Sequence, residues 1–69
     1  MAIRTAGQFA RERREELGLS RERFAVETEV SVSTVVRLEN HDHLPRVPAL
    51  IRIAAGLRCS LDEIAGVSR

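Results

Sequence analysis

The sequence predicts a small all-α domain, and three observations lead to this fold class. Apolar residues recur at helical spacing, capping residues precede the apolar segments, and no stretch alternates in the manner of a β-strand. At 69 residues the chain has room for one domain, which we assign to residues 1–69. It contains two Phe and neither Trp nor Tyr, so the core must consist mainly of aliphatic side chains. A core this small leaves a thin margin of stability, which favours dimerisation as a further source.

The first helix is predicted to begin after Thr5 and to end before Gly18. Thr5 and Gln8 have the spacing of a capping box, in which each side chain accepts a hydrogen bond from the other residue's backbone N–H. Glycine is the residue most often found just beyond the end of a helix. The charged run 11–16 is typical of a solvated helix face with pairs of opposite charge one turn apart.

Two short helices joined by a tight turn are predicted next. Ser20 caps the first of them, which spans about two turns before the pattern breaks at residues 28–30. Ser31 caps the second, which we predict over Val32–Glu39. The polar loop 40–45 then ends it.

Two further helices complete the predicted fold. Pro48 suits the first turn of a fourth helix, where its missing N–H costs nothing. The apolar positions of this helix form a wide stripe that should be buried: Leu50, Ile51, Ile53, Ala54 and Leu57. Ser60 and Glu63 repeat the capping-box spacing and indicate a short fifth helix.

The segment 32–39 has two distinct faces when its residues are placed at 100° intervals. Val35 and Leu38 share one side, which we assign to the core. The opposite side carries Ser33, Val36 and Arg37, with Val32 at its edge. A short helix held by a capped turn against a preceding helix, with a free face, is the arrangement that enters a DNA major groove. Any small helical bundle also has exposed faces, so spacing alone leaves the function open.

Three segments carry a resemblance to a known family. "LGLSRERFA" (17–25), "VSVSTVVRLEN" (30–40) and "LIRIAAGLRCSLDEI" (50–64) resemble the lambda-repressor-like family, also called XRE or Cro-type helix-turn-helix proteins. The similarity runs from about Gly7 to Ile64 with the three segments in the family's order and spacing. It implies a compact five-helix lambda-repressor-like domain whose second and third helices form the helix-turn-helix.

The resemblance also implies two sets of DNA contacts. The positions that approach base edges coincide with the free face derived above: Val32, Ser33, Val36 and Arg37. The positions that contact the DNA backbone are Arg21, Ser31, Thr34, Asn40 and Arg46. Arg21 replaces the family's usual Gln and would hold a phosphate as a charged donor. Arg46 matches a loop position whose basic side chain lies along the minor groove in some relatives, the alternative being a solvated arginine.

A salt bridge and two departures from the family pattern complete the expectations from the resemblance. Arg14 and Glu39 match a pair that in some members joins the first helix to the recognition helix through a buried salt bridge. Glu29 and His41 stand where the family prefers Gly. The turn at Glu29 often needs a positive φ, so we expect it to be strained or differently shaped.

We therefore predict a sequence-specific double-stranded DNA-binding protein, a repressor or Cro-like transcriptional regulator that acts as a homodimer on a pseudo-palindromic operator. The candidate subunit contact is Leu61, Ile64 and Val67, unless these residues close the monomer's own core. Residues 20–40 contain three Arg and four Glu, so one copy should attract phosphates only weakly. The alternatives are a protein-interaction module such as an antitoxin, or the DNA-binding part of a larger regulator.

Other classes of function find little support in the sequence. No enzyme motif, cofactor site or small-molecule site is evident, and we expect the protein not to be an enzyme. His41 and His43 lie too close together to form a zinc site without distant ligands, so no metal is expected. Cys59, the one cysteine, is interpreted as a small core residue. No apolar run is long enough to span a membrane, and we expect a cytoplasmic protein.

Overall fold

The structure, a computed structural model, describes residues 4–66, which fold into helices without any strand. The helices are α1 (Ala6–Glu16), α2 (Arg21–Thr28), α3 (Val32–His41), α4 (Val47–Gly56) and α5 (Leu61–Gly66). The predicted all-α class with five helices is confirmed. Within the described range, no helix has both the length and the apolar character that a membrane crossing requires.

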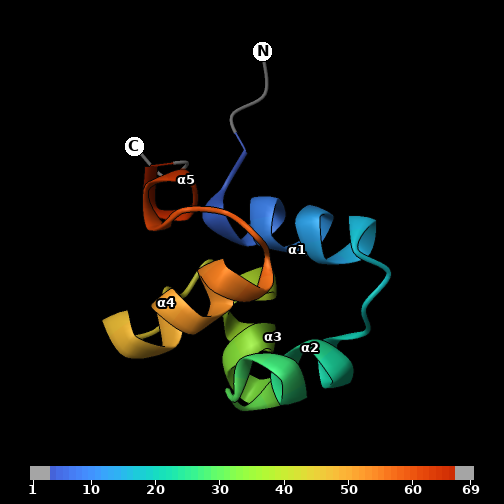
Figure 1. Ribbon diagram of the computed structural model, residues 1–69. Helices are drawn as coiled ribbons and strands as arrows, with labels where there is room; N and C mark the ends of the chain where they lie inside the picture. The colour runs from blue at the N-terminus through green and yellow to red at the C-terminus, as the bar shows by residue number, and fades with distance from the viewer. Residues whose placement is uncertain (1–3, 67–69) are drawn as a thin grey trace.

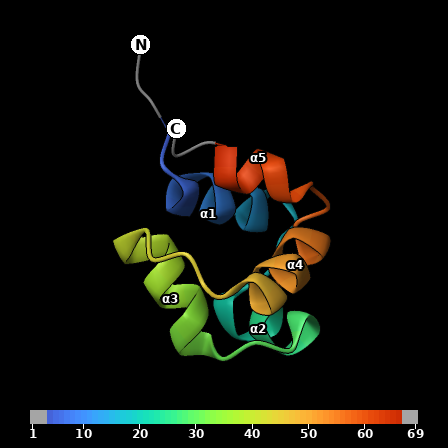
Figure 2. The same ribbon diagram turned by 90° about the vertical axis from the view of Figure 1, so that its left-hand side faces the viewer.

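The five helices enclose one core. Helix α1 packs against α3 and α5, α2 packs against α3 and α4, and α4 packs against α5. Figures 1 and 2 both show α5 beside α1, on the side away from α2 and α3. The main neighbours of α3 are therefore α1 and α2, while Ser33, Arg37 and Asn40 on this helix are exposed.

Hydroxyl caps begin four of the five helices, as their sequences predict. The side chains of Thr5, Ser20, Ser31 and Ser60 each accept a hydrogen bond of 3.0–3.1 Å from the N–H three residues later. The first and last of these are complete capping boxes, because Gln8 and Glu63 accept the cap residue's N–H in return. Helix α4 lacks a side-chain cap and has proline in its first turn.

A residue in the left-handed conformation follows each of the first four helices. Gly18 has φ 73°, Glu29 59°, Asp42 53° and Arg58 58°. After α1, α2 and α4, the next N–H bonds to a carbonyl five residues earlier, which satisfies an unpaired helix end. Since three of these four residues are not glycine, the chain carries backbone strain at these positions, which Asp tolerates better than Glu or Arg.

Helix α3 extends two residues beyond the predicted end at Glu39. Asn40 and His41 are helical, so His41, which stands where the family prefers Gly, lies within α3, and the left-handed residue is Asp42. Oδ1 of Asp42 accepts the N–H of Gly7 at 2.9 Å, which fixes the end of α3 against the start of α1. The predicted end at Glu39 was wrong because the contact that fixes the end of α3 is made with Gly7, 35 residues from Asp42 in the chain.

The core is aliphatic apart from one phenylalanine. Its fully buried members include Val35 and Leu38 of α3, as the helical wheel predicted. Most of the apolar stripe on α4 is buried too, but Ile51 is 50% exposed, which corrects the expectation that the whole stripe is covered. The main neighbours of α4 are α2 and α5, and together they leave Ile51 half exposed.

Candidate nucleic-acid interface

The turn between α2 and α3 is built around Glu29. This residue has φ 59° and ψ 38°, the left-handed conformation that the sequence suggested for this position. The N–H of Val30 bonds to the carbonyl of Ala25 at 3.1 Å, and Ser31 then caps α3. The turn therefore has an ordinary shape that glutamate is forced to adopt at a steric cost.

Helix α3 separates its buried and exposed residues as predicted. Val35 and Leu38 are anchored in the core, whereas Ser33 and Arg37 are exposed. Val36 is partly exposed, and Val32 is 38% exposed. An open hollow on the surface of α3 is lined by Val32, Ser33, Val36, Arg37 and His41. The four expected base-reading residues therefore share one surface, to which the helix extension adds His41.

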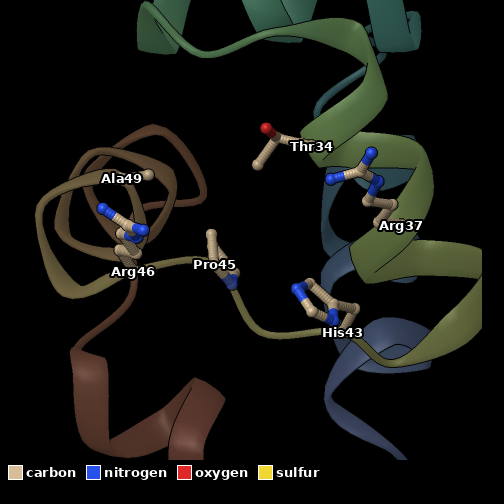
Figure 3. Close-up of a pocket in the computed structure, with 6 residues that line it drawn as sticks. All are labelled: Thr34, Arg37, His43, Pro45, Arg46 and Ala49. Atoms are coloured by element: carbon tan, nitrogen blue, oxygen red, sulfur yellow. The ribbon is translucent and has the colours of Figure 1, made fainter.

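A second hollow lies between α3 and the start of α4. It is lined by Thr34, Arg37, His43, Pro45, Arg46 and Ala49. Figure 3 shows Thr34 and Arg37 on one side of it, and Pro45, Arg46 and Ala49 on the other. Arg37 belongs to both hollows and thus sits between the outer face of α3 and the loop. The basic residues here, with no acidic one in the lining, make this the positive side of the surface.

Arg14 and Glu39 form a buried ion pair between α1 and α3. Arg14 Nε donates to Glu39 Oε2 at 2.7 Å and Arg14 Nη2 to Oε1 at 3.0 Å, with side chains 9% and 2% exposed. A further N–H of Arg14 donates to the carbonyl of Leu19. The hydrogen bond with Glu39 raises the pKa of Arg14, an effect that burial partly offsets. This pair ties α3 to α1.

Arg21 also binds Glu39, which the sequence did not suggest. Its Nε donates to Glu39 Oε1 at 3.1 Å and its Nη2 to Asn40 Oδ1 at 3.2 Å. Two residues expected to contact DNA phosphates separately are therefore bonded to each other. Because Gln is usual at the Arg21 position in the family, the resemblance gave no signal of this ion pair.

Ser31 and Thr34, expected at the sugar-phosphate chain, are hydrogen-bonded to each other. Their hydroxyls lie 2.8 Å apart, and Ser31 also accepts the N–H of Thr34. Thr34 lines the second hollow, and Figure 3 shows Arg46 on the opposite side of it. Arg46 is exposed at the start of α4.

The expected subunit contact needs one correction. Ile64 is completely buried inside the chain, because α5 packs against α1 and α4. The side chain of Ile64 is therefore not available for contact with a second copy. Leu61 is partly buried against the same core. Val67 lies outside the described residues. The alternative that these residues close the monomer's core therefore holds for Ile64.

The charged run on α1 is less solvated than predicted. Arg11 and Glu15 do form an exposed pair at 3.4 Å. Arg13, however, donates from Nε to the carbonyl of Leu57 and from Nη2 to that of Arg58, each at 3.1 Å. It thus binds the carbonyls that follow α4, a role without a local sequence signal because the partners lie 44 and 45 residues away.

A capped two-helix unit with an anchored inner face and a free outer face defines a helix-turn-helix domain. The model of a helix-turn-helix family matches residues 11–64, more than three quarters of the chain. The chain belongs to this family, which is of the lambda-repressor-like type and consists of DNA-binding regulators. Comparison of this chain with curated proteins and with solved structures gave no match.

Proposed function

We propose that this protein binds double-stranded DNA sequence-specifically by inserting α3 into the major groove, and that it regulates transcription as a repressor or Cro-like protein. The observation that carries the proposal is the hollow on the outer face of α3, where Val32, Ser33, Val36 and Arg37 lie together while the inner face is buried. Such a surface can approach base edges without disturbing the core.

The chemistry of this face sets the expected mode of recognition. Arg37 can form a bidentate contact with guanine, whereas Val32 and Val36 can contact only apolar groups such as the thymine methyl. The hydroxyl of Ser33 adapts to several partners. With few hydrogen-bonding groups, the protein should draw part of its selectivity from the shape of the DNA.

Backbone contacts would come from the residues that surround this face. We assign Ser31 and Thr34 to the sugar-phosphate chain, together with Arg21 and Asn40 near the start of α2 and the end of α3. We assign Arg46 to the DNA backbone as well; it lines the second hollow, where His43 offers a further polar group.

A homodimer is part of the proposal, since a pseudo-palindromic operator presents two half-sites whose centres lie about 34–36 Å apart. Sedimentation of the free protein and of the protein with a duplex tests this step. If the mass of the complex at saturation corresponds to one protein chain per duplex, the dimer is rejected. The proposal also places the protein in the cytoplasm.

The decisive test is selection of binding sites from random duplexes, followed by titration of the selected duplex at several salt concentrations. We expect a two-fold-symmetric consensus and an affinity that falls steeply with salt, because DNA binding releases counterions. A contact with a protein partner through the valines of α3 would depend little on salt. Failure to enrich any sequence would therefore favour the protein-interaction alternative.

A further inference from the structure

Glu39 is shared between two arginines from different helices. Its carboxylate, 2% exposed, accepts hydrogen bonds from Nε and Nη2 of Arg14 on α1 and from Nε of Arg21 on α2. Arg14 is buried, whereas the side chain of Arg21 is 30% exposed and reaches the surface. One buried negative charge thus holds a structural arginine and a surface arginine at once.

Asn40 is oriented by the same network. Its Oδ1 accepts from Nη2 of Arg21, which fixes the amide because a guanidinium has only donors to offer. The NH₂ group of Asn40 is then left to donate elsewhere, as is Nη1 of Arg21. Within residues 4–66, neither of these groups donates to another side chain or carbonyl. The N–H groups of Arg21 and Asn40, which are bonded to each other, are therefore available together at the surface.

We propose that Glu39 is a positioning residue that presents Arg21 and Asn40 as a preformed, two-residue clamp for one DNA phosphate. This inference rests on the proposed DNA binding and adds the residue that organises the contact. A long arginine side chain that is free in solution must lose rotamer freedom when it binds a phosphate. Because Glu39 already holds Arg21 by its Nε, that loss has largely occurred in the free protein.

Charge and positioning make opposite predictions for the substitution Glu39→Gln. The substitution raises the net charge of the protein by one, so long-range attraction alone would strengthen binding to DNA. If Glu39 acts by positioning, the neutral amide releases Arg21 and Asn40, and affinity falls about tenfold, as for the loss of a charge-assisted hydrogen bond. The salt dependence then weakens by about one phosphate contact.

The experiment measures the affinity of the full chain for its selected duplex by fluorescence anisotropy, from about 50 to 200 mM salt. It is run at a temperature at which circular dichroism shows every variant to be folded. Glu16→Gln is the matched control, because it makes the same charge change at an exposed site on α1. We expect weaker binding for Glu39→Gln, and unchanged or slightly tighter binding for Glu16→Gln.

A second variant keeps the proposal testable if Glu39→Gln does not fold. Arg21→Lys retains the charge but loses the fork that binds Glu39 and Asn40 together, so affinity should fall while the salt dependence changes little. Glu39→Gln binding as tightly as the wild type, or Arg21→Lys doing so, would overturn the clamp. A wild-type protein that binds no duplex in a salt-dependent way would reject the proposed function itself, which is a separate result.

Discussion

The backbone N–H of Gly7 donates to Oδ1 of Asp42 across 2.9 Å, which joins the first turn of α1 to the residue that ends α3. The carboxylate satisfies an N–H that the helix itself leaves unpaired, and its charge favours the positive end of the helix dipole. This contact requires the two backbones to approach closely. It also makes the end of α3 depend on the start of α1.

Gly7 should accept no larger side chain. A Cβ on this residue would overlap the carbonyl oxygen of Leu38 and lie 2.7 Å from Oδ1 of Asp42. We expect Gly7→Ala to destabilise the protein by about 1–3 kcal/mol by overpacking, although alanine is the better helix former. Denaturant unfolding measures this effect. Glu16→Ala, exposed on the same helix, is the control and should change stability by less than about 0.5 kcal/mol; equal effects would contradict the prediction.

Arg14→Ala should unfold the domain more than Arg13→Ala. Removing Arg14 leaves the buried carboxylate of Glu39 with one weaker partner, at a cost of about 3–5 kcal/mol. Removing Arg13 loses two hydrogen bonds to carbonyls in a more exposed place, which costs about 1–2 kcal/mol. Thermal unfolding compares the two variants. Equal melting temperatures would show that burial of the Glu39 pair adds nothing.

Glu29→Gly should stabilise the protein. The wild-type residue adopts φ 59°, which costs a non-glycine residue about 1–2 kcal/mol, while glycine adds some entropy to the unfolded chain. A net gain of about 0.5–1 kcal/mol follows, and Arg58→Gly should behave in the same way. A higher melting temperature is the expected readout. If both variants melt below the wild type, the side chains must form contacts that outweigh the strain.

Arg37→Ala should relax sequence preference at one base pair per half-site, because its bidentate contact with guanine is worth about 1–3 kcal/mol of discrimination. Arg21→Ala should instead weaken binding to all sequences alike. Repeating the binding-site selection with each variant separates the two roles. A consensus for Arg37→Ala identical to that of the wild type would refute base reading by this residue.

The capping box of α5 should weaken in acid. The hydrogen bond from the backbone N–H of Ser60 is the main reason that the pKa of Glu63 lies below its ordinary value. A carboxyl group with a lowered pKa in the folded state stabilises that state while it is ionised. Its contribution is complete above the ordinary glutamate pKa and is lost as the pH falls through the lower, folded-state value.

Thermal unfolding of wild type and Glu63→Gln between about pH 6 and pH 3 tests this sign. The stability advantage of the wild type should shrink as the pH falls, because glutamine does not titrate. Glu16→Gln serves as the control at an exposed position on another helix. A constant difference between wild type and Glu63→Gln across this range would mean that the charge of Glu63 contributes nothing.

The candidate site could be located from the sequence to the extent that it depends on helix geometry. The spacing within 32–39 placed Val35 and Leu38 in the core and Ser33 and Arg37 at the surface, and the structure agrees. The addition of His41 to this face was missed because the helix end depends on Asp42 and its distant partner. Asp is a residue that tolerates the left-handed conformation, so its identity was the available signal.

The sequence by itself determined which segments are helical and where α1, α2, α3 and α5 begin, because capping uses partners three residues apart in the chain. Only the tertiary structure decided what the long side chains bind. Arg21 reaches Glu39 across 18 residues, and Arg13 reaches Leu57 across 44. An arginine offers the same donors to every acceptor, so its partner is chosen by packing. Packing likewise decides the place of Ile64, which belongs to the core because α5 packs against α1 and α4.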